Sequence, residues 1–131
     1  MAQAESSRGR ETVLVVEDSP LVRKLMQEVL ELNGYRVYEA ANGHAALEIA
    51  GQPGMHLDLL LTDVTLPGMN GRELADALTA RQPDLKVVFA SGHGSDALGK
   101  FGVAANAGFL EKPFSPKDLA RKVREILDAR S

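Results

Sequence analysis

Five short apolar runs define the pattern of this chain, and each is followed by a polar turn and a stretch with helical periodicity. These runs are predicted strands over residues 12–16, 35–38, 57–61, 86–90 and 108–110. Val13–Val16 and Leu59–Leu61 are continuously apolar, which is typical of parallel strands covered on both faces. Alternation of such strands with helices predicts a parallel sheet with helices on both sides, joined by right-handed crossovers.

The helical stretches carry recognisable start and stop signals. Ser19-Pro20 and Asn33-Gly34 are predicted to begin and end the first helix. Further helices are expected after Asn42, after Asn70-Gly71, over about 95–106 and from Ser115-Pro116. Their inward faces are predicted from helical spacing to be Leu21, Leu25, Val29 and Leu32 in the first helix, Ala46, Ile49 and Ala50 in the second, Leu74, Ala77 and Leu78 in the third, and Leu119, Val123, Ile126 and Leu127 in the last.

Length and composition narrow the class of protein. A chain of 131 residues suits one domain, expected over 11–129 after a polar, disordered lead-in over 1–10. The net charge of -3 argues against direct binding of nucleic acid, and the absence of cysteine excludes thiol catalysis and disulfides. No run approaches the roughly 18 apolar residues of a membrane span, so we expect no direct membrane contact and a cytoplasmic location.

Ionisable and hydroxyl side chains stand at the ends of four predicted strands. Glu17 and Asp18 follow the first strand, Asp63 the third, Ser91 the fourth and Lys112 the fifth. The carboxyl ends of parallel strands share one edge of the sheet, where ligands bind, so these side chains should meet there. Three carboxylates repel one another unless cations intervene, and a divalent ion together with one lysine would balance their charge. Carboxylate oxygens suit Mg²⁺, and the set predicts a phosphoryl-transfer site.

Four segments carry a resemblance to a known family. They are Val15–Ser19, Leu60–Gly71, Phe89–Gly92 and Gly108–Phe114, in the right order and on the right elements. Over about residues 11–128 the chain resembles response-regulator receiver domains. The resemblance implies an α/β flavodoxin-like, doubly wound five-stranded parallel sheet of order 2-1-3-4-5 with five helices.

The same resemblance implies a role for individual residues. Asp63 would be the phosphoacceptor, helped by Lys112 and Ser91. Mg²⁺, or Mn²⁺ in its place, would be bound by Asp18, Asp63 and the backbone carbonyl of Thr65, with Glu17 acting through water. The remaining implied features are a switch formed by Ser91 and Phe109, where tyrosine is commoner, tuning of the dephosphorylation rate by Thr65 and His93, and a cis Lys112-Pro113 peptide bond.

The function implied is that of a phosphorelay regulator rather than an enzyme. Its donor would be a histidine kinase or a histidine phosphotransfer protein, and its only chemistry would be self-directed phosphoryl transfer and autodephosphorylation. Residues 89–93 and the tail Ala120–Leu127 are most similar to receivers attached to hybrid sensor kinases. The chain is expected to be either a stand-alone regulator or a receiver that belongs to a larger protein, and this similarity favours attachment to a larger hybrid kinase.

Taken one at a time, these residues also fit ordinary structural roles. Ser19 and Asp18 could cap a helix, Asp63 could be a turn residue, and Lys112 could be a solvated lysine. A small nucleotide-binding enzyme domain is the main alternative, because Gly92, Gly94 and Ala97 follow a strand as in a dinucleotide-binding loop. That alternative leaves the three carboxylates and the lysine unexplained. A degenerate receiver kept only for protein interaction is disfavoured, since every polar site residue is present.

Overall fold

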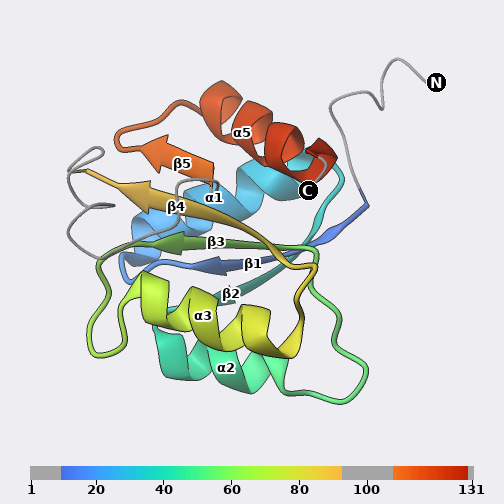
Figure 1. Cartoon of the computed structure of the whole chain (residues 1–131). Coiled ribbons are helices and arrows are strands. Elements are labelled where there is room, and N and C mark those ends of the chain that lie inside the picture. The colour runs from blue at the N-terminus through green and yellow to red at the C-terminus, as the bar shows by residue number, and fades with distance from the viewer. Residues whose placement is uncertain (1–9, 93–107, 130–131) are drawn as a thin grey trace.

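The sheet has five parallel strands in the order β2-β1-β3-β4-β5, as predicted (Figure 1). The computed structural model describes residues 10–92 and 108–129. Within them the strands are β1 (Thr12–Val16), β2 (Arg36–Ala40), β3 (Leu59–Asp63), β4 (Lys86–Ser91) and β5 (Gly108–Glu111). Each neighbouring pair is parallel, so the connections within the described residues cross over the sheet.

Helices cover both faces of this sheet (Figure 1). One layer contains α1 (Pro20–Leu32) and α5 (Pro116–Asp128), which contact each other. The opposite layer contains α2 (Gly43–Ala50) and α3 (Gly71–Arg81). The fifth predicted helix, over about 95–106, lies outside the described residues. No helix in the described ranges is long and apolar enough to span a membrane.

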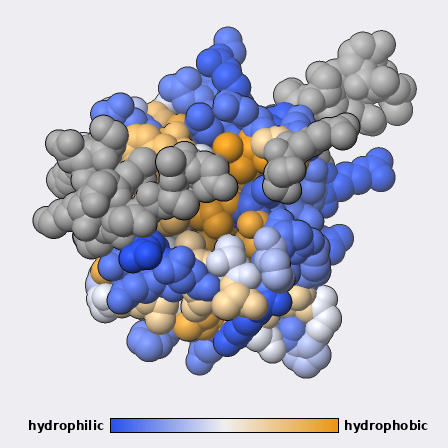
Figure 2. Space-filling view, in the orientation of Figure 1, coloured by the Kyte–Doolittle hydropathy of each residue, from blue (hydrophilic) through white to orange (hydrophobic). Residues whose placement is uncertain are grey.

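The two layers explain the continuous apolar runs of the central strands. Val13 and Val15 of β1 pack into the core beneath α1 and α5, whereas Leu14 and Val16 pack into the core above α2 and α3. All four side chains are completely buried. Successive residues of a strand point to opposite faces, so a strand covered twice must be apolar at every position. Hydrophobic residues gather in the band between α5 and α3, and mostly hydrophilic residues lie over the outward side of α5 (Figure 2).

Helix termini follow the predicted signals. Each described helix begins after a residue whose side-chain oxygen accepts a hydrogen bond from the backbone N–H three residues later, namely Ser19, Asn42, Asn70 and Ser115. At the other end of α1, Asn33 is the C-cap and Gly34 has a φ of 94°, a left-handed conformation that favours glycine. These local contacts satisfy amide groups that a helix leaves unpaired.

The predicted inward face of α1 is confirmed for Val29 and wrong for Leu21, Leu25 and Leu32. Leu21 and Leu32 are 81% and 76% exposed. The buried face instead contains Met26, Val29 and Leu30. This helix carries apolar residues on more than one side, so periodicity alone could not orient it, and packing against the sheet and α5 selects the face. For the other helices, the predicted positions Ala46, Leu74, Leu78, Leu119 and Val123 are buried.

Strand β3 begins at Leu59, two residues later than predicted. Leu57 is buried, but it does not pair with a neighbouring strand of the sheet. The side chain of Gln82 pairs with its backbone instead: the Leu57 N–H donates to Gln82 Oε1 over 3.1 Å, and Gln82 Nε2 donates to the Leu57 carbonyl. Strand β2 extends beyond its predicted end, since it stays in register with β1 from Thr12 opposite Arg36 to Val16 opposite Ala40.

Arg124 connects α5 to the beginning of the sheet. Its Nη2 lies 2.8 Å from Glu11 Oε2 and 2.8 Å from Asp128 Oδ1, and its Nη1 donates to the Tyr35 hydroxyl over 3.2 Å. The hydrogen bond from Arg124 is the main reason that the pKa of Glu11 lies below its ordinary value. Glu11 therefore stabilises the fold in its charged form.

We predict that Glu11→Gln lowers the free energy of unfolding by about 0.5–1 kcal/mol at about pH 7, a partly exposed pair being screened by solvent. A lowered folded-state pKa gives stability that is present above the unfolded pKa of about 4.3 and is lost as the pH falls through the folded value. The difference between variant and wild type should therefore vanish at about pH 3 in urea titrations. Glu125→Gln is the control, because Glu125 is an exposed glutamate of α5, the helix that contains Arg124. An equal loss at both pH values would contradict the prediction.

Candidate functional site

The carboxyl ends of four strands bring the predicted polar residues to one edge of the sheet. Glu17 and Asp18 follow β1, Asp63 is the last residue of β3, Ser91 is the last residue of β4, and Lys112 follows β5. Glu17 and Asp63 are only 1% and 5% exposed, and Ser91 is also buried. Asp18 faces solvent. Buried polar side chains are therefore concentrated at this edge of the sheet.

The three carboxylates form a compact cluster. One oxygen each from Glu17, Asp18 and Asp63 lies within 4.8 Å of the others. Charges of the same sign at this separation repel one another strongly when they are removed from water. The cluster thus requires a shared proton or a cation.

Lys112 supplies the cation within the chain. Its Nζ lies 2.7 Å from Glu17 Oε1 and 2.7 Å from Asp63 Oδ1. Burial lowers the pKa of Lys112, but the bonds to Asp63 and Glu17 outweigh burial and raise it above its ordinary value. The backbone holds this lysine in place, since its N–H donates to the Ser91 carbonyl over 2.9 Å. The Lys112-Pro113 peptide bond is cis, as the resemblance implied.

The pKa values of the two buried carboxyl groups, Asp63 and Glu17, shift in opposite directions. Burial, followed by the hydrogen bond with Glu17, raises the pKa of Asp63 to about 7, although Lys112 opposes the shift. Burial also raises the pKa of Glu17, but bonds with Asp63, Lys112 and the Ser19 amide outweigh it, so that pKa is lowered. The Ser19 N–H donates to Glu17 Oε2 over 3.0 Å. Without a metal ion the pair therefore takes up one proton as the pH falls through about 7, and Asp63 rather than Glu17 holds it.

The donor set fits a small divalent cation. Among the described residues, the buried Asp63 Oδ1 has the Lys112 ammonium, 2.7 Å away, as its charged partner. An oxygen in a cluster of carboxylates is the kind of ligand that Mg²⁺ prefers. A divalent ion would also neutralise the negative charge of the three carboxylates that Lys112 does not balance.

The loop after Asp63 depends on Gly71, the first residue of α3. The Gly71 N–H donates to the Val64 carbonyl over 2.8 Å. A Cβ atom at Gly71 would lie 1.9 Å from the Asp63 carbonyl oxygen, so only glycine fits there. The sequence predicted Asn70-Gly71 as a helix start and missed this contact. Thr65 lies in the same loop with an exposed side chain.

Some predicted residues lie elsewhere. Phe109 is partly buried on β5, opposite Phe89 of β4, and packs against the core above α2 and α3. His93, Gly94 and Ala97 lie outside the described residues, so their assigned roles in rate tuning and nucleotide binding stay predictions.

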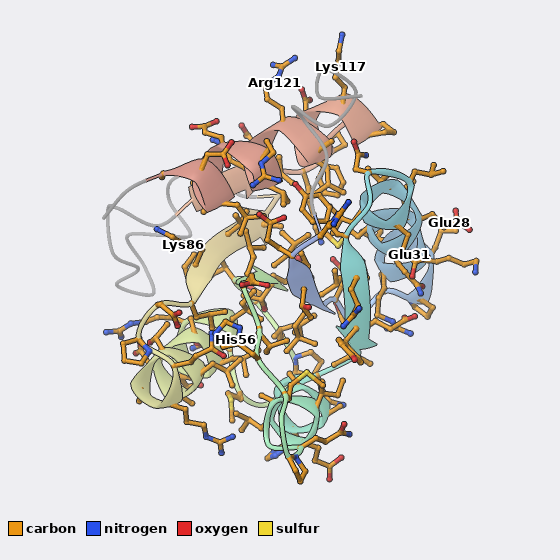
Figure 3. All side chains as sticks on the ribbon, turned by 90° about the vertical axis from the view of Figure 1, so that its right-hand side faces the viewer. Glu28, Glu31, His56, Lys86, Lys117 and Arg121 are labelled. Atoms are coloured by element: carbon orange, nitrogen blue, oxygen red, sulfur yellow. The ribbon has the colours of Figure 1, made fainter. Side chains whose placement is uncertain are left out.

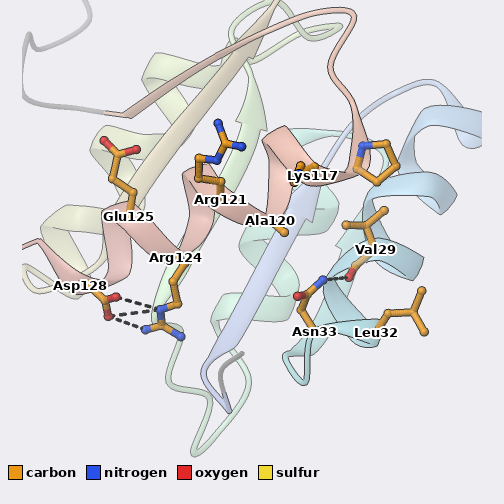
Figure 4. Close-up of a pocket in the computed structure, with 10 residues that line it drawn as sticks. Val29, Leu32, Asn33, Lys117, Ala120, Arg121, Arg124, Glu125 and Asp128 are labelled. Carbon is orange, nitrogen blue, oxygen red and sulfur yellow. Dashed lines mark hydrogen bonds and ion pairs between the residues drawn. The ribbon is translucent and has the colours of Figure 1, made fainter. Parts of the chain in front are cut away.

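A groove of about 750 Å³ lies between α1 and α5 (Figure 4). Its lining contains Val29, Leu32, Asn33, Pro116, Lys117, Ala120, Arg121, Arg124, Glu125 and Asp128. This lining includes neither Lys112 nor any of the three clustered carboxylates. The groove is therefore separate from the site at the strand ends.

We predict that Gly71→Ala lowers the free energy of unfolding by about 2 kcal/mol, because the new methyl group must displace the backbone of Asp63. Gly43→Ala is a matched control, since Gly43 also begins a helix after a capping asparagine. Its Cβ would meet only the movable side chain of Met69, 3.0 Å away, so the loss should stay below about 1 kcal/mol. Equal losses in chemical denaturation would show that the backbone contact at Gly71 is unimportant.

We also predict that Asp63→Asn stabilises the metal-free protein by about 1–3 kcal/mol at about pH 8, because it removes a buried charge. A raised folded-state pKa contributes stability below the unfolded pKa, and this contribution is lost as the pH rises through about 7. The gain in melting temperature should therefore be larger at about pH 8 than at about pH 5. A variant less stable than wild type at both pH values would contradict the shared-proton arrangement.

Known proteins similar to this chain are receiver domains or contain one. A family model described as the response regulator receiver domain matches residues 13–124. The sensor kinase CckA of Brucella abortus is 42% identical over 127 residues, covering 96% of this chain and 13% of that protein. The response regulator receiver protein CpdR of the same organism is 37% identical over 119 residues, covering 89% of this chain and 97% of that protein.

Solved structures agree with this assignment. The receiver domain of the hybrid histidine kinase CckA matches with a TM-score of 0.76 and 34% identity, covering 89% of this chain and 99% of that one. The chemotaxis response regulator CheY4 of Vibrio cholerae matches with a TM-score of 0.79 and 29% identity, covering 90% and 99%. The chain spans only 13%, 46% and 31% of the length of three of its curated relatives. Fold, motifs and matches together show that the chain belongs to the response regulator receiver domain family of two-component systems.

Proposed function

We propose that Asp63 accepts a phosphoryl group from a histidine kinase or a histidine phosphotransfer protein in a Mg²⁺-dependent reaction. The observation that carries this proposal is the buried Asp63 carboxylate at the end of β3, with two further carboxylates within 4.8 Å and Lys112 Nζ 2.7 Å away. A helix cap or a turn residue needs no such surroundings. The chain would act as a regulator whose only chemistry is on itself.

Asp18, Asp63 and the backbone carbonyl of Thr65 would hold the Mg²⁺, with Glu17 acting through water. Mn²⁺ should substitute, since carboxylates and carbonyls suit both ions. When bound, the ion supplies positive charge to the phosphoryl oxygens. Three carboxylates, one lysine and a divalent ion sum to no net charge, which suits a site that receives an anionic group.

In the transfer step, a carboxylate oxygen of Asp63 forms the new O–P bond while the P–N bond to the donor imidazole breaks. The leaving nitrogen keeps the electron pair and takes a proton from solvent. Lys112, already paired with Asp63, would balance the charge that arrives on the phosphoryl oxygens. Autodephosphorylation follows when water attacks the phosphorus atom, which releases inorganic phosphate and restores the carboxylate. Thr65 and His93 would tune the rate of this second step.

Phosphorylation would switch the conformation through Ser91 and Phe109. The Ser91 hydroxyl, at the buried end of β4, would hydrogen-bond a phosphoryl oxygen and leave room for Phe109 on the neighbouring strand. Because Phe109 has no hydroxyl, its two positions would differ by packing alone, which implies a modest bias between states. The surface formed by β5 and α5 would read the change. It would include Arg121, which points outward from α5, away from the sheet (Figure 3).

The relatives point to two settings for such a regulator. A receiver attached to a larger hybrid kinase corresponds to the match with CckA, and a separate regulator corresponds to CpdR, which the chain covers almost completely. The higher identity, 42% against 37%, favours the hybrid kinase. In both settings the donor would be a phosphohistidine.

The acceptor is tested by incubating the protein with acetyl phosphate and Mg²⁺ and recording intact mass. Wild type should gain one phosphoryl group that is lost with hydroxylamine, because an acyl phosphate is reactive toward that nucleophile. Chelation of the metal and Asp63→Asn should each abolish the gain. Asp76→Asn, at an exposed aspartate on α3, is the matched control and should be phosphorylated normally. An equal yield in Asp63→Asn would refute the assignment.

A further inference from the structure

Arg23 of α1 binds the backbone of the turn that carries the acidic pair. Its Nη1 donates to the Glu17 carbonyl oxygen over 2.8 Å, and its Nε donates to Glu39 Oε1 of β2 over 2.9 Å. The Arg23 side chain is only 19% exposed. A guanidinium fixed at two points in this way is a rigid support, since its donors lie in one plane.

Other contacts hold the residues on either side of Asp18: Lys112 Nζ lies 2.7 Å from Glu17 Oε1, and the Arg23 N–H donates to the Ser19 carbonyl over 2.9 Å. The Glu17 N–H donates to the Ala40 carbonyl over 3.1 Å, and the Ser19 N–H donates to Glu17 Oε2 over 3.0 Å. Within the described residues, the carboxylate of Asp18 has no hydrogen bond or ion pair of its own, although one of its oxygens lies within the 4.8 Å cluster. The course of the backbone from Glu17 to Ser19 therefore sets where Asp18 points.

We propose that Arg23 is a positioning residue for the divalent-cation site. By holding the Glu17 carbonyl, it fixes the backbone from which Asp18 projects toward Asp63. Glu39 holds the guanidinium from the second strand, so the turn is connected to α1, β1 and β2 at once. The inference rests on the proposed function, because that function places the cation between Asp18 and Asp63.

The positive charge of Arg23 and its contact with the Glu17 carbonyl predict opposite changes in Mg²⁺ affinity when the side chain is removed. As a charge alone, Arg23 repels a nearby divalent cation, so its removal would tighten Mg²⁺ binding. As a support, its removal loosens the turn and weakens binding. Groups that orient metal ligands typically change metal affinity by about 10–100-fold when they are lost. The sign of the change in affinity therefore separates the two roles.

The test is a Mg²⁺ titration of the full chain, followed through amide NMR shifts, with wild type, Arg23→Ala, Arg23→Lys and Lys24→Ala. Arg23→Ala should raise the Kd for Mg²⁺ about tenfold. Arg23→Lys should lie between it and wild type, because an ammonium group cannot reproduce the planar pair of contacts. Lys24→Ala removes the same charge from an exposed neighbouring position paired with Glu28, and should leave the Kd within about twofold of wild type.

A second readout needs no metal. Amide hydrogen exchange at Asp18 and Ser19 should be faster in Arg23→Ala than in wild type, and unchanged in Lys24→Ala. If wild type binds Mg²⁺ and Arg23→Ala binds it equally or more tightly, the positioning role is overturned while the proposed function stands. If wild type shows no Mg²⁺-dependent shift, both fail. Should Arg23→Ala not fold, the same criteria apply to Arg23→Lys.

Discussion

Repulsion among the carboxylates of Glu17, Asp18 and Asp63 is the constraint around which the rest of this structure is arranged. Two of the three are almost completely buried, and their oxygens lie within 4.8 Å of one another. Lys112 offsets part of the charge. Burial, followed by the hydrogen bond with Glu17, raises the pKa of Asp63 to about 7 while that of Glu17 is lowered, so a proton on Asp63 can offset more. A divalent cation would replace that proton. Three carboxylates and one lysine leave a net negative charge, which a divalent ion would offset, and the neutral site that results would suit an anionic group.

Holding such a cluster together requires rigid supports around it. The central strands are buried on both faces, so their ends cannot move apart without opening two cores. Gly71 lets α3 begin directly against the backbone of Asp63, where any side chain would collide with the carbonyl oxygen. Arg23 holds the turn after β1 from the opposite helical layer. These contacts involve backbone atoms, and they place the carboxylates without adding further charge to the cluster itself.

Membership of the receiver family assigns the chain to two-component systems, but relatives of very different length share this domain. The chain covers 13% of the sensor kinase CckA and 97% of CpdR. The chemistry proposed for the strand ends would be compatible with both settings, because it would require only a phosphorylated donor that can reach the edge of the sheet.

Local patterns in the sequence determined the strands, the capped helix starts and the residues that stand at the strand ends, because each depends on neighbouring residues. The strand order came from the resemblance to receiver domains, since no local pattern specifies which strands are neighbours. Long-range packing decided the rest. Only contact with the sheet and α5 could choose Met26 and Leu30 over Leu21 and Leu32 as the inward face of α1. Likewise, the bonds of Arg23, Gln82 and Arg124 join residues from separate elements, and no local signal marks them. The division of one proton between Glu17 and Asp63 also depends on burial and on distances of a few ångströms, which exist only in the folded chain.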